Sequence, residues 1–214
     1  MLNISIEQAR KWYEEADTVH DFEHVLRVYH TAEHLAQIEG ADLEIIHTAA
    51  LLHDVCGATP GSEARKEHHL TSAIFAAEVL TEAGWTIERI LAVQHCIRAH
   101  RFRGNADEPP ATLEAKIIFD ADKLDVIGAI GVARVIAYAA LAGAPFYAEP
   151  SEQFLKTGKK APGEPHSAYH EHLFKLRHIK ERLFTPAARR LAEERDAYIE
   201  AYFQRLGAEM RGEL

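Results

Sequence analysis

Apolar and polar positions alternate with the period of an α-helix along almost the whole chain. The segment DFEHVLRVYHTAEHLAQIEG places four apolar residues on one face, namely Val25, Val28, Ala32 and Leu35. The next segment, LEIIHTAALLHDV, is apolar on nearly all sides, as is typical of a central and buried helix. Nowhere do apolar residues recur at every second position, which is the pattern of a half-buried β-strand. The pattern therefore predicts an all-α fold, built as a single-domain helical bundle.

Further helical patterns follow until the end of the chain, with one long interruption. The last helix is predicted to begin with Thr185 as its N-cap and Pro186 at its first helical position. The interruption, residues 144–165, is rich in Pro, Gly and Lys. A loop of this length in a compact domain is either functional, as a lid or mobile segment, or a solvated connector. The sequence leaves both interpretations of this loop open.

Length and composition favour one globular domain that spans residues 1–214. The chain has 214 residues, of which 47% are hydrophobic, so it can bury a substantial core. Its formal net charge of −9 argues against a sequence-independent nucleic-acid binder, which needs a basic face, and no nucleic-acid duplex is expected as a partner. A small phosphorylated ligand remains compatible with this charge, because a few local basic residues suffice to bind it.

The chain shows no sign of a membrane or secretory context. Two cysteines give no disulfide framework, and the N-terminal residues lack the basic and apolar regions of a signal peptide. The longest apolar stretch is interrupted by Arg134 and predicts a packed helix rather than a membrane span. We expect a cytoplasmic protein.

Candidate chemistry appears where acids and histidines interrupt apolar helices. These residues form three blocks: His20, Asp21 and His24; His53 and Asp54; and Asp120, Asp122 and Asp125. Burying an imidazole or a carboxylate is costly unless a base, a hydrogen-bond network or a metal ion partners it. Three such blocks in one small bundle favour one shared site over three independent burials.

A divalent cation explains this composition well. Neutral imidazoles and ionised carboxylates bind Mn, Fe, Co, Ni or Zn, and sites rich in carboxylates also accept Mg. No cysteine belongs to the set, so a thiolate zinc site is not expected. Spacing does not by itself place His53 and Asp54 on one ion, because adjacent helical residues point about 100° apart.

The three blocks in this order, in DFEHVLRV, AALLHDV and FDADKLDVIGAIGVAR, resemble the HD-domain superfamily of metal-dependent phosphohydrolases. The similarity is greatest to small stand-alone prokaryotic members, and it covers most of the chain. It implies an all-α HD-type bundle that holds one or two divalent ions. Its metal-binding core would span about residues 18–143, with C-terminal helices at about 166–211 packing on that core. The metal ligands that the resemblance implies are His24, His53, Asp54 and Asp122.

The same resemblance implies the reaction. A water activated by the metal would attack phosphorus, and Asp54 would orient that water or take its proton. The expected substrates are nucleotides, either nucleoside mono- or triphosphates, because the small members of the family mostly act on them. The candidate phosphate-binding residues are Arg27, Lys123, His100 and Arg101.

Five further residues are weaker candidates. His20 and Asp125 lie near ligands in the sequence, and Asp125 is expected three residues from Asp122 on one helix face, as a support for the ligands or a partner for Arg27 or Lys123. His95, His170 and Lys175 stand where relatives tend to keep similar residues. Five other histidines follow no ligand pattern and are assigned to the surface or to structural roles: His30, His34, His47, His68 and His69.

Three other functions compete with the phosphohydrolase. HDFEH resembles the zinc-protease pattern H-E-x-x-H, but Asp21 replaces the Glu that acts as its base. A di-iron oxygenase of the HD type needs more histidines around its second metal, for which only His95 and His100 suggest themselves. A non-catalytic module that binds a nucleotide or a partner would usually have lost a ligand, whereas all four are present. A homodimer is kept as an open expectation.

Overall fold

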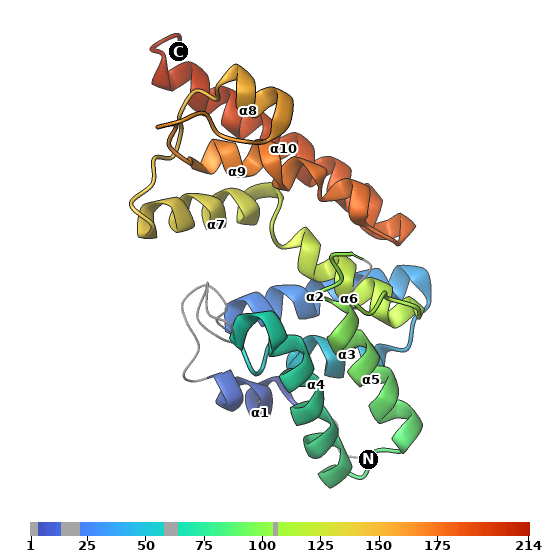
Figure 1. Ribbon diagram of the computed structural model, residues 1–214. Helices are drawn as coiled ribbons and strands as arrows, with labels where there is room; N and C mark the ends of the chain where they lie inside the picture. Colours follow the sequence, from blue (N-terminus) through green and yellow to red (C-terminus); the bar gives the residue numbers. More distant parts are fainter. Residues whose placement is uncertain (1–3, 14–21, 58–63, 105–106) are drawn as a thin grey trace. The chain divides into compact units, whose positions relative to one another are not determined.

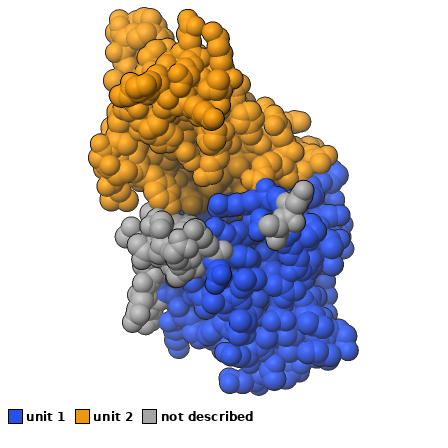
Figure 2. All heavy atoms as spheres, in the orientation of Figure 1, with its two compact units in different colours: residues 1–122, 184–188 blue, residues 123–183, 189–214 orange. Residues whose placement is uncertain are grey.

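Every regular element in the described part of the chain is a helix, which confirms the predicted all-α fold (Figure 1). The computed structural model describes residues 4–13, 22–57, 64–104 and 107–214. The chain divides into two compact units, which Figure 2 shows in different colours. Unit 1 comprises residues 1–122 and 184–188, and unit 2 comprises residues 123–183 and 189–214.

The chain enters unit 2 after residue 122 and again after residue 188. The described helices up to the first of these crossings are α1 (Ile6–Arg10), the 3-10 helix η1 (Lys11–Tyr13), α2 (Phe22–Glu39), α3 (Leu43–Leu52), α4 (Ala64–Glu82), α5 (Ile87–Ala99) and α6 (Leu113–Leu124). They are followed by α7 (Gly128–Leu141), α8 (Glu152–Thr157), α9 (Ala168–Phe174), η2 (Leu176–His178), η3 (Lys180–Arg182) and α10 (Pro186–Met210).

Helix α3 forms the centre of unit 1. It packs against both α2 and α5, and its apolar residues are buried on nearly all sides, as the sequence predicted. Its N-terminus is capped by Asp42, whose carboxylate accepts hydrogen bonds from the backbone N–H groups of Glu44 and Ile45. Its C-cap is His53. The most buried helix of unit 1 therefore delivers the His53–Asp54 pair into the interior.

Asp120 joins α6 to the segment that starts α10. Its fully buried carboxylate accepts hydrogen bonds from the Phe184 N–H (2.9 Å), the Thr185 N–H (2.8 Å) and the Thr185 hydroxyl (2.8 Å). These bonds lie within unit 1 and satisfy donors at the N-terminal end of α10. They also explain why an acid occupies this apolar helix without being a metal ligand.

In unit 2, the segment 144–165 is more ordered than its composition predicted. It contains α8, which Ser151 caps at its N-terminus and Gly158 ends in the left-handed conformation (φ 69°). The carboxylate of Glu164 accepts from the Ser151 N–H and hydroxyl and from the Ala161 N–H, each at 2.6 Å, and it lies 3.0 Å from His170 Nε2. Bonds from Ser151 and His170 lower the pKa of Glu164 to about 2. One carboxylate therefore ties the segment to α9.

Replacing Glu164 with glutamine is expected to open this segment. The amide nitrogen cannot accept hydrogen bonds, so at least one donor loses its partner, and local opening becomes easier. Trypsin cleavage after Lys159 or Lys160 should accelerate about tenfold, whereas Glu152→Gln, which changes only an exposed pair with Lys156, should leave it unchanged. Equal cleavage rates in both variants would show that Glu164 does not hold the segment.

No single helix among the described residues is long and apolar enough to cross a membrane, and only α6 and α7 taken together as a bent pair reach that length and composition.

The expectation that helices at about 166–211 pack on a core of about 18–143 stays a prediction.

Candidate metal centre

The four ligands implied by the sequence lie close together in unit 1. His24 is on α2, His53 and Asp54 follow α3, and Asp122 lies near the end of α6. The Nε2 atom of His24 is 3.4 Å from Asp122 Oδ1 and 3.9 Å from Asp54 Oδ2, and His53 Nε2 is 3.8 Å from the same Asp54 oxygen. Two ligand atoms at about 2.1 Å from one ion lie roughly 3 to 4 Å apart. The spacing of His24, His53 and Asp122 thus suits a single cation.

The local structure fixes which nitrogen of His53 faces the site. At the C-cap of α3, the Nδ1–H of His53 donates to the Ala50 carbonyl oxygen at 2.8 Å. This bond leaves the lone pair of Nε2 directed away from the backbone. Nε2 is buried and has no hydrogen-bond partner among the described residues. An orphaned, buried acceptor beside two carboxylates fits a metal ligand.

Asp54 and two further histidines form a second group of possible ligands. It consists of Asp54, His68 on α4 and His100, the C-cap of α5, and all three side chains are buried. Asp54 Oδ1 lies 3.0 Å from His68 Nε2 and 3.4 Å from His100 Nε2. The Nδ1–H of His100 donates to the Ile97 carbonyl oxygen at 2.6 Å, as in His53. His53 and His100, each at the C-terminal end of a helix, are therefore oriented by the same kind of hydrogen bond to a backbone carbonyl three residues earlier.

Asp54 belongs to the second group but also faces the first group, which is His24, His53 and Asp122. Its Oδ1 faces His68 and His100, and its Oδ2 faces His24 and His53. Burial by itself would raise the pKa of this carboxyl, but the neighbouring His53 and hydrogen bonds from His100 and His68 hold it well below its usual range. Burial lowers the pKa of His53 to about 4, so its ring is neutral at neutral pH. An ionised carboxylate and a neutral imidazole are the forms that bind a divalent ion.

The candidate phosphate-binding residues other than His100 lie partly at the surface. Arg27 is half-buried on α2 one turn after His24, and Arg101 is half-buried directly after His100. Lys123 is half-buried next to Asp122, at the first position of unit 2. The structure thus places Arg27 and Arg101 on elements that also carry members of the two groups.

The supporting role expected of Asp125 stays a prediction. Asp125 directly follows Leu124, the last residue of α6. Asp125 lies in the turn before α7, is buried in unit 2, and accepts a hydrogen bond from Arg134.

The other weaker candidates make contacts away from the two groups. His95 holds the loop before α6, with Nδ1–H donating to Glu108 at 2.5 Å and Nε2 accepting from the Ala111 N–H at 3.0 Å. In unit 2, His170 is buried against Glu164 and Ser167, and Lys175 pairs with Glu171 on the surface. His20 lies outside the described residues.

The sequence analysis missed His68. It was assigned to the surface or to a structural role, yet its side chain belongs to the second group. In the structure His68 is buried on α4, as are Ser72, Ala76 and Leu80. Its neighbours in the sequence are polar, so the local pattern gave no signal for it.

Comparison with known proteins agrees with this geometry. The model of the HD domain family matches residues 21–127. YpgQ of Bacillus subtilis (strain 168) is 32% identical over 212 residues, which cover 96% of this chain and 94% of that protein. The crystal structure of Bacillus subtilis YpgQ in complex with ADP has a TM-score of 0.72 and 29% identity, and covers 97% of this chain and 99% of that one. The crystal structure of an HD-superfamily hydrolase from Bacillus thuringiensis has a TM-score of 0.71 and 28% identity. The match covers 96% of this chain and 94% of that one. With its fold and its match over half of the sequence, the chain belongs to the HD domain family.

Proposed function

We propose that this protein is a divalent-metal-dependent phosphohydrolase that acts on nucleotides. The observation that carries the proposal is the set of histidine side chains around the buried carboxylate of Asp54. The Nε2 atoms of four histidines, His24, His53, His68 and His100, lie within 3.9 Å of its two carboxylate oxygens. Asp122 adds a second carboxylate beside His24. A buried arrangement of this kind offers ligands for one or two ions of Mn, Mg, Co, Ni, Fe or Zn.

The residues of the chain have distinct proposed roles. His24, His53, Asp54 and Asp122 would hold the ion, which when bound supplies a Lewis acid for a phosphate oxygen and lowers the pKa of a water. Asp54 would orient the attacking water or accept its proton. Arg27, Lys123, His100 and Arg101 would neutralise phosphate charge. His68 and His100 add a place for a second ion, with Asp54 between the two.

Nucleotides are the proposed substrate class because of the relatives. YpgQ of Bacillus subtilis, similar over nearly its full length, was crystallised in complex with ADP. The phosphates of such a ligand would meet the cation and the basic side chains of unit 1, Arg27 and Arg101. Whether the enzyme cuts a monoester or an anhydride bond follows from the products.

Release of phosphate and of pyrophosphate from nucleoside mono-, di- and triphosphates tests this function. We expect release only when the purified protein is loaded with Mn, Mg, Co or Ni, and the product identifies the bond that is cut. Phosphate alone from monophosphates indicates a monoester, whereas pyrophosphate from triphosphates indicates the α–β anhydride. A metal-loaded protein that releases neither product from any nucleotide would contradict the assignment.

A di-iron oxygenase is the second candidate, and one observation favours it. The second group contains two histidines, His68 and His100, where the sequence had suggested only His95 and His100. Oxygen uptake by the iron-loaded protein separates the two functions. The phosphohydrolase predicts no uptake with any nucleotide or polyol, whereas substrate-dependent uptake would favour the oxygenase.

A further inference from the structure

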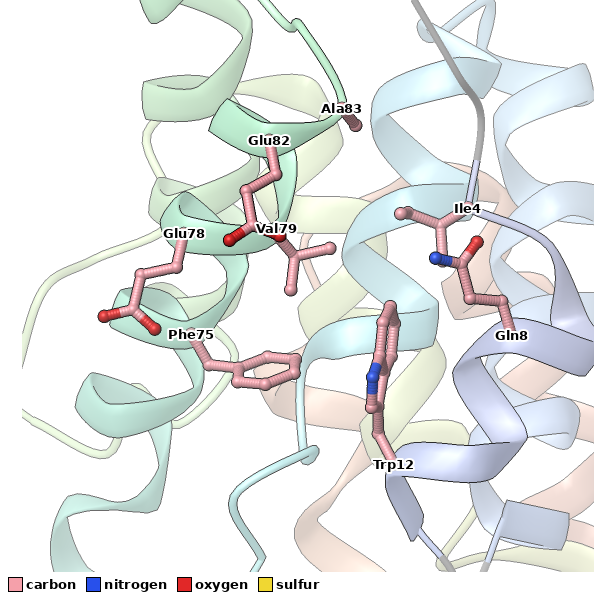
Figure 3. A pocket seen from close by; sticks show the side chains of 8 residues that line it. All are labelled: Ile4, Gln8, Trp12, Phe75, Glu78, Val79, Glu82 and Ala83. Atoms are coloured by element: carbon pink, nitrogen blue, oxygen red, sulfur yellow. The ribbon is translucent and has the colours of Figure 1, made fainter.

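A hollow lies in unit 1, between the N-terminal helices and α4 (Figure 3). Its volume is about 510 Å³, within the range of about 300–1,000 Å³ that is usual for small-molecule sites. The residues that line it are Ile4, Gln8, Trp12, Phe75, Glu78, Val79, Glu82 and Ala83. None of them belongs to the two His/Asp groups, so the hollow is a separate candidate site.

Aromatic rings face each other across this hollow, Trp12 from η1 and Phe75 from α4. Trp12 and Phe75 meet edge to face, with ring centroids 5.3 Å apart, and both side chains are only half-buried. In Figure 3, Phe75 points toward the indole of Trp12, and Ile4 and Gln8 lie on the other side of that indole. Val79 completes the apolar surface. A flexible alkyl chain buries its methylene groups well against apolar side chains of this kind, here Ile4, Trp12, Phe75 and Val79.

The α4 side of the hollow, which carries Phe75 and Val79, also carries two carboxylates (Figure 3). Glu78 and Glu82 are exposed and one turn apart on α4, so their carboxylates repel each other. They also occupy the last two turns of the helix, where the carbonyl ends of the macrodipole add negative charge, and its last turn holds no basic residue. Among the described residues, no Lys, Arg or His forms an ion pair with either carboxylate. A positive charge is therefore favoured beside Glu78 and Glu82, at the C-terminal end of α4.

From this combination we infer that the hollow binds a protonated aliphatic amine, a linear diamine or polyamine. Its ammonium group lies at Glu78 and Glu82, while its methylenes cover Trp12, Phe75 and Val79. An anion is excluded by the two carboxylates. A neutral apolar ligand would leave the carboxylates unpaired and gain nothing from the charge of α4.

The indole N–H resonances of the full-length protein provide the test. The protein has two tryptophans, and Trp85 serves as an internal control because it is buried against Arg89 on α5. Titration with cadaverine or spermidine at constant ionic strength should shift the Trp12 resonance until it saturates, and leave that of Trp85 in place. The Trp12→Phe variant assigns the signal. Pentane-1,5-diol, of similar length but neutral, should cause no saturable shift.

Two double variants separate a specific site from general attraction to an acidic protein. Glu78→Gln with Glu82→Gln should weaken amine binding about tenfold or more, because both charge partners are lost. Glu193→Gln with Glu194→Gln removes the same charge from exposed positions of α10 and should not change it. No saturable shift of Trp12, equal binding by the diol, or equal affinities in the two double variants would each overturn the proposal.

Discussion

Asp54→Asn is expected to reduce metal-dependent hydrolysis by at least about a hundredfold. Asparagine keeps the shape of the side chain but removes the charge that lies within 3.9 Å of four histidine Nε2 atoms. Even groups that only support metal ligands typically account for about 10- to 100-fold in affinity or activity. Initial rates of phosphate or pyrophosphate release, measured at several concentrations of Mn, show whether the loss persists when metal is in excess.

The matched control is Asp42→Asn. Asp42 is a partly exposed carboxylate of the same unit, and asparagine caps a helix about as well as aspartate does. Hydrolysis by this variant should equal that of the unchanged protein. If Asp54→Asn retained more than a tenth of the rate with an unchanged fold, Asp54 could not have the central role proposed for it.

Asp120→Ala is expected to cause the largest loss of stability, about 3–5 kcal/mol. The substitution leaves two backbone N–H groups and the Thr185 hydroxyl without their acceptor in the interior, and each buried unsatisfied donor costs about 1–3 kcal/mol. Urea unfolding at neutral pH, followed by circular dichroism, measures the change in the free energy of unfolding.

Asp42→Ala is the comparison for this prediction. It also removes a carboxylate that accepts two backbone N–H groups, and in addition a partly exposed pair with Arg89. Loss of such a cap costs about 1 kcal/mol and loss of an exposed ion pair about 0–1 kcal/mol. Asp120→Ala should therefore be clearly less stable than Asp42→Ala. An equal or smaller loss at Asp120 would mean that water or a shift of the chain satisfies the three donors.

The sequence was a good guide where a residue's role depends on its own helix. The resemblance to the HD-domain superfamily selected His24, His53, Asp54 and Asp122, which the fold brings together. The apolar stripes of α2 and α3 predicted both helices, and acids or histidines in apolar surroundings pointed to the three blocks. Each of these signals is local, because it follows from the contrast between a polar residue and its helical neighbours.

The sequence was a poor guide where a role depends on a helix end or on a packing partner. Helical spacing related Asp125 to Asp122, but it could not show that Arg134 of the following helix donates to Asp125. His68 lies among polar residues in the sequence, and only the packing of α4 against α5 brings it to His100 and Asp54. The acceptor role of Glu164 depends on Ser151, thirteen residues away across an irregular segment.

The most direct test of the account is anomalous X-ray diffraction from crystals grown with Mn²⁺. We predict an anomalous peak within coordination distance of His24, His53, Asp54 and Asp122, and a second peak beside His68 and His100 if two ions bind together. A crystal that shows full-occupancy Mn²⁺ elsewhere, or none at these side chains, would contradict the claim that Asp54 and its histidines hold a metal.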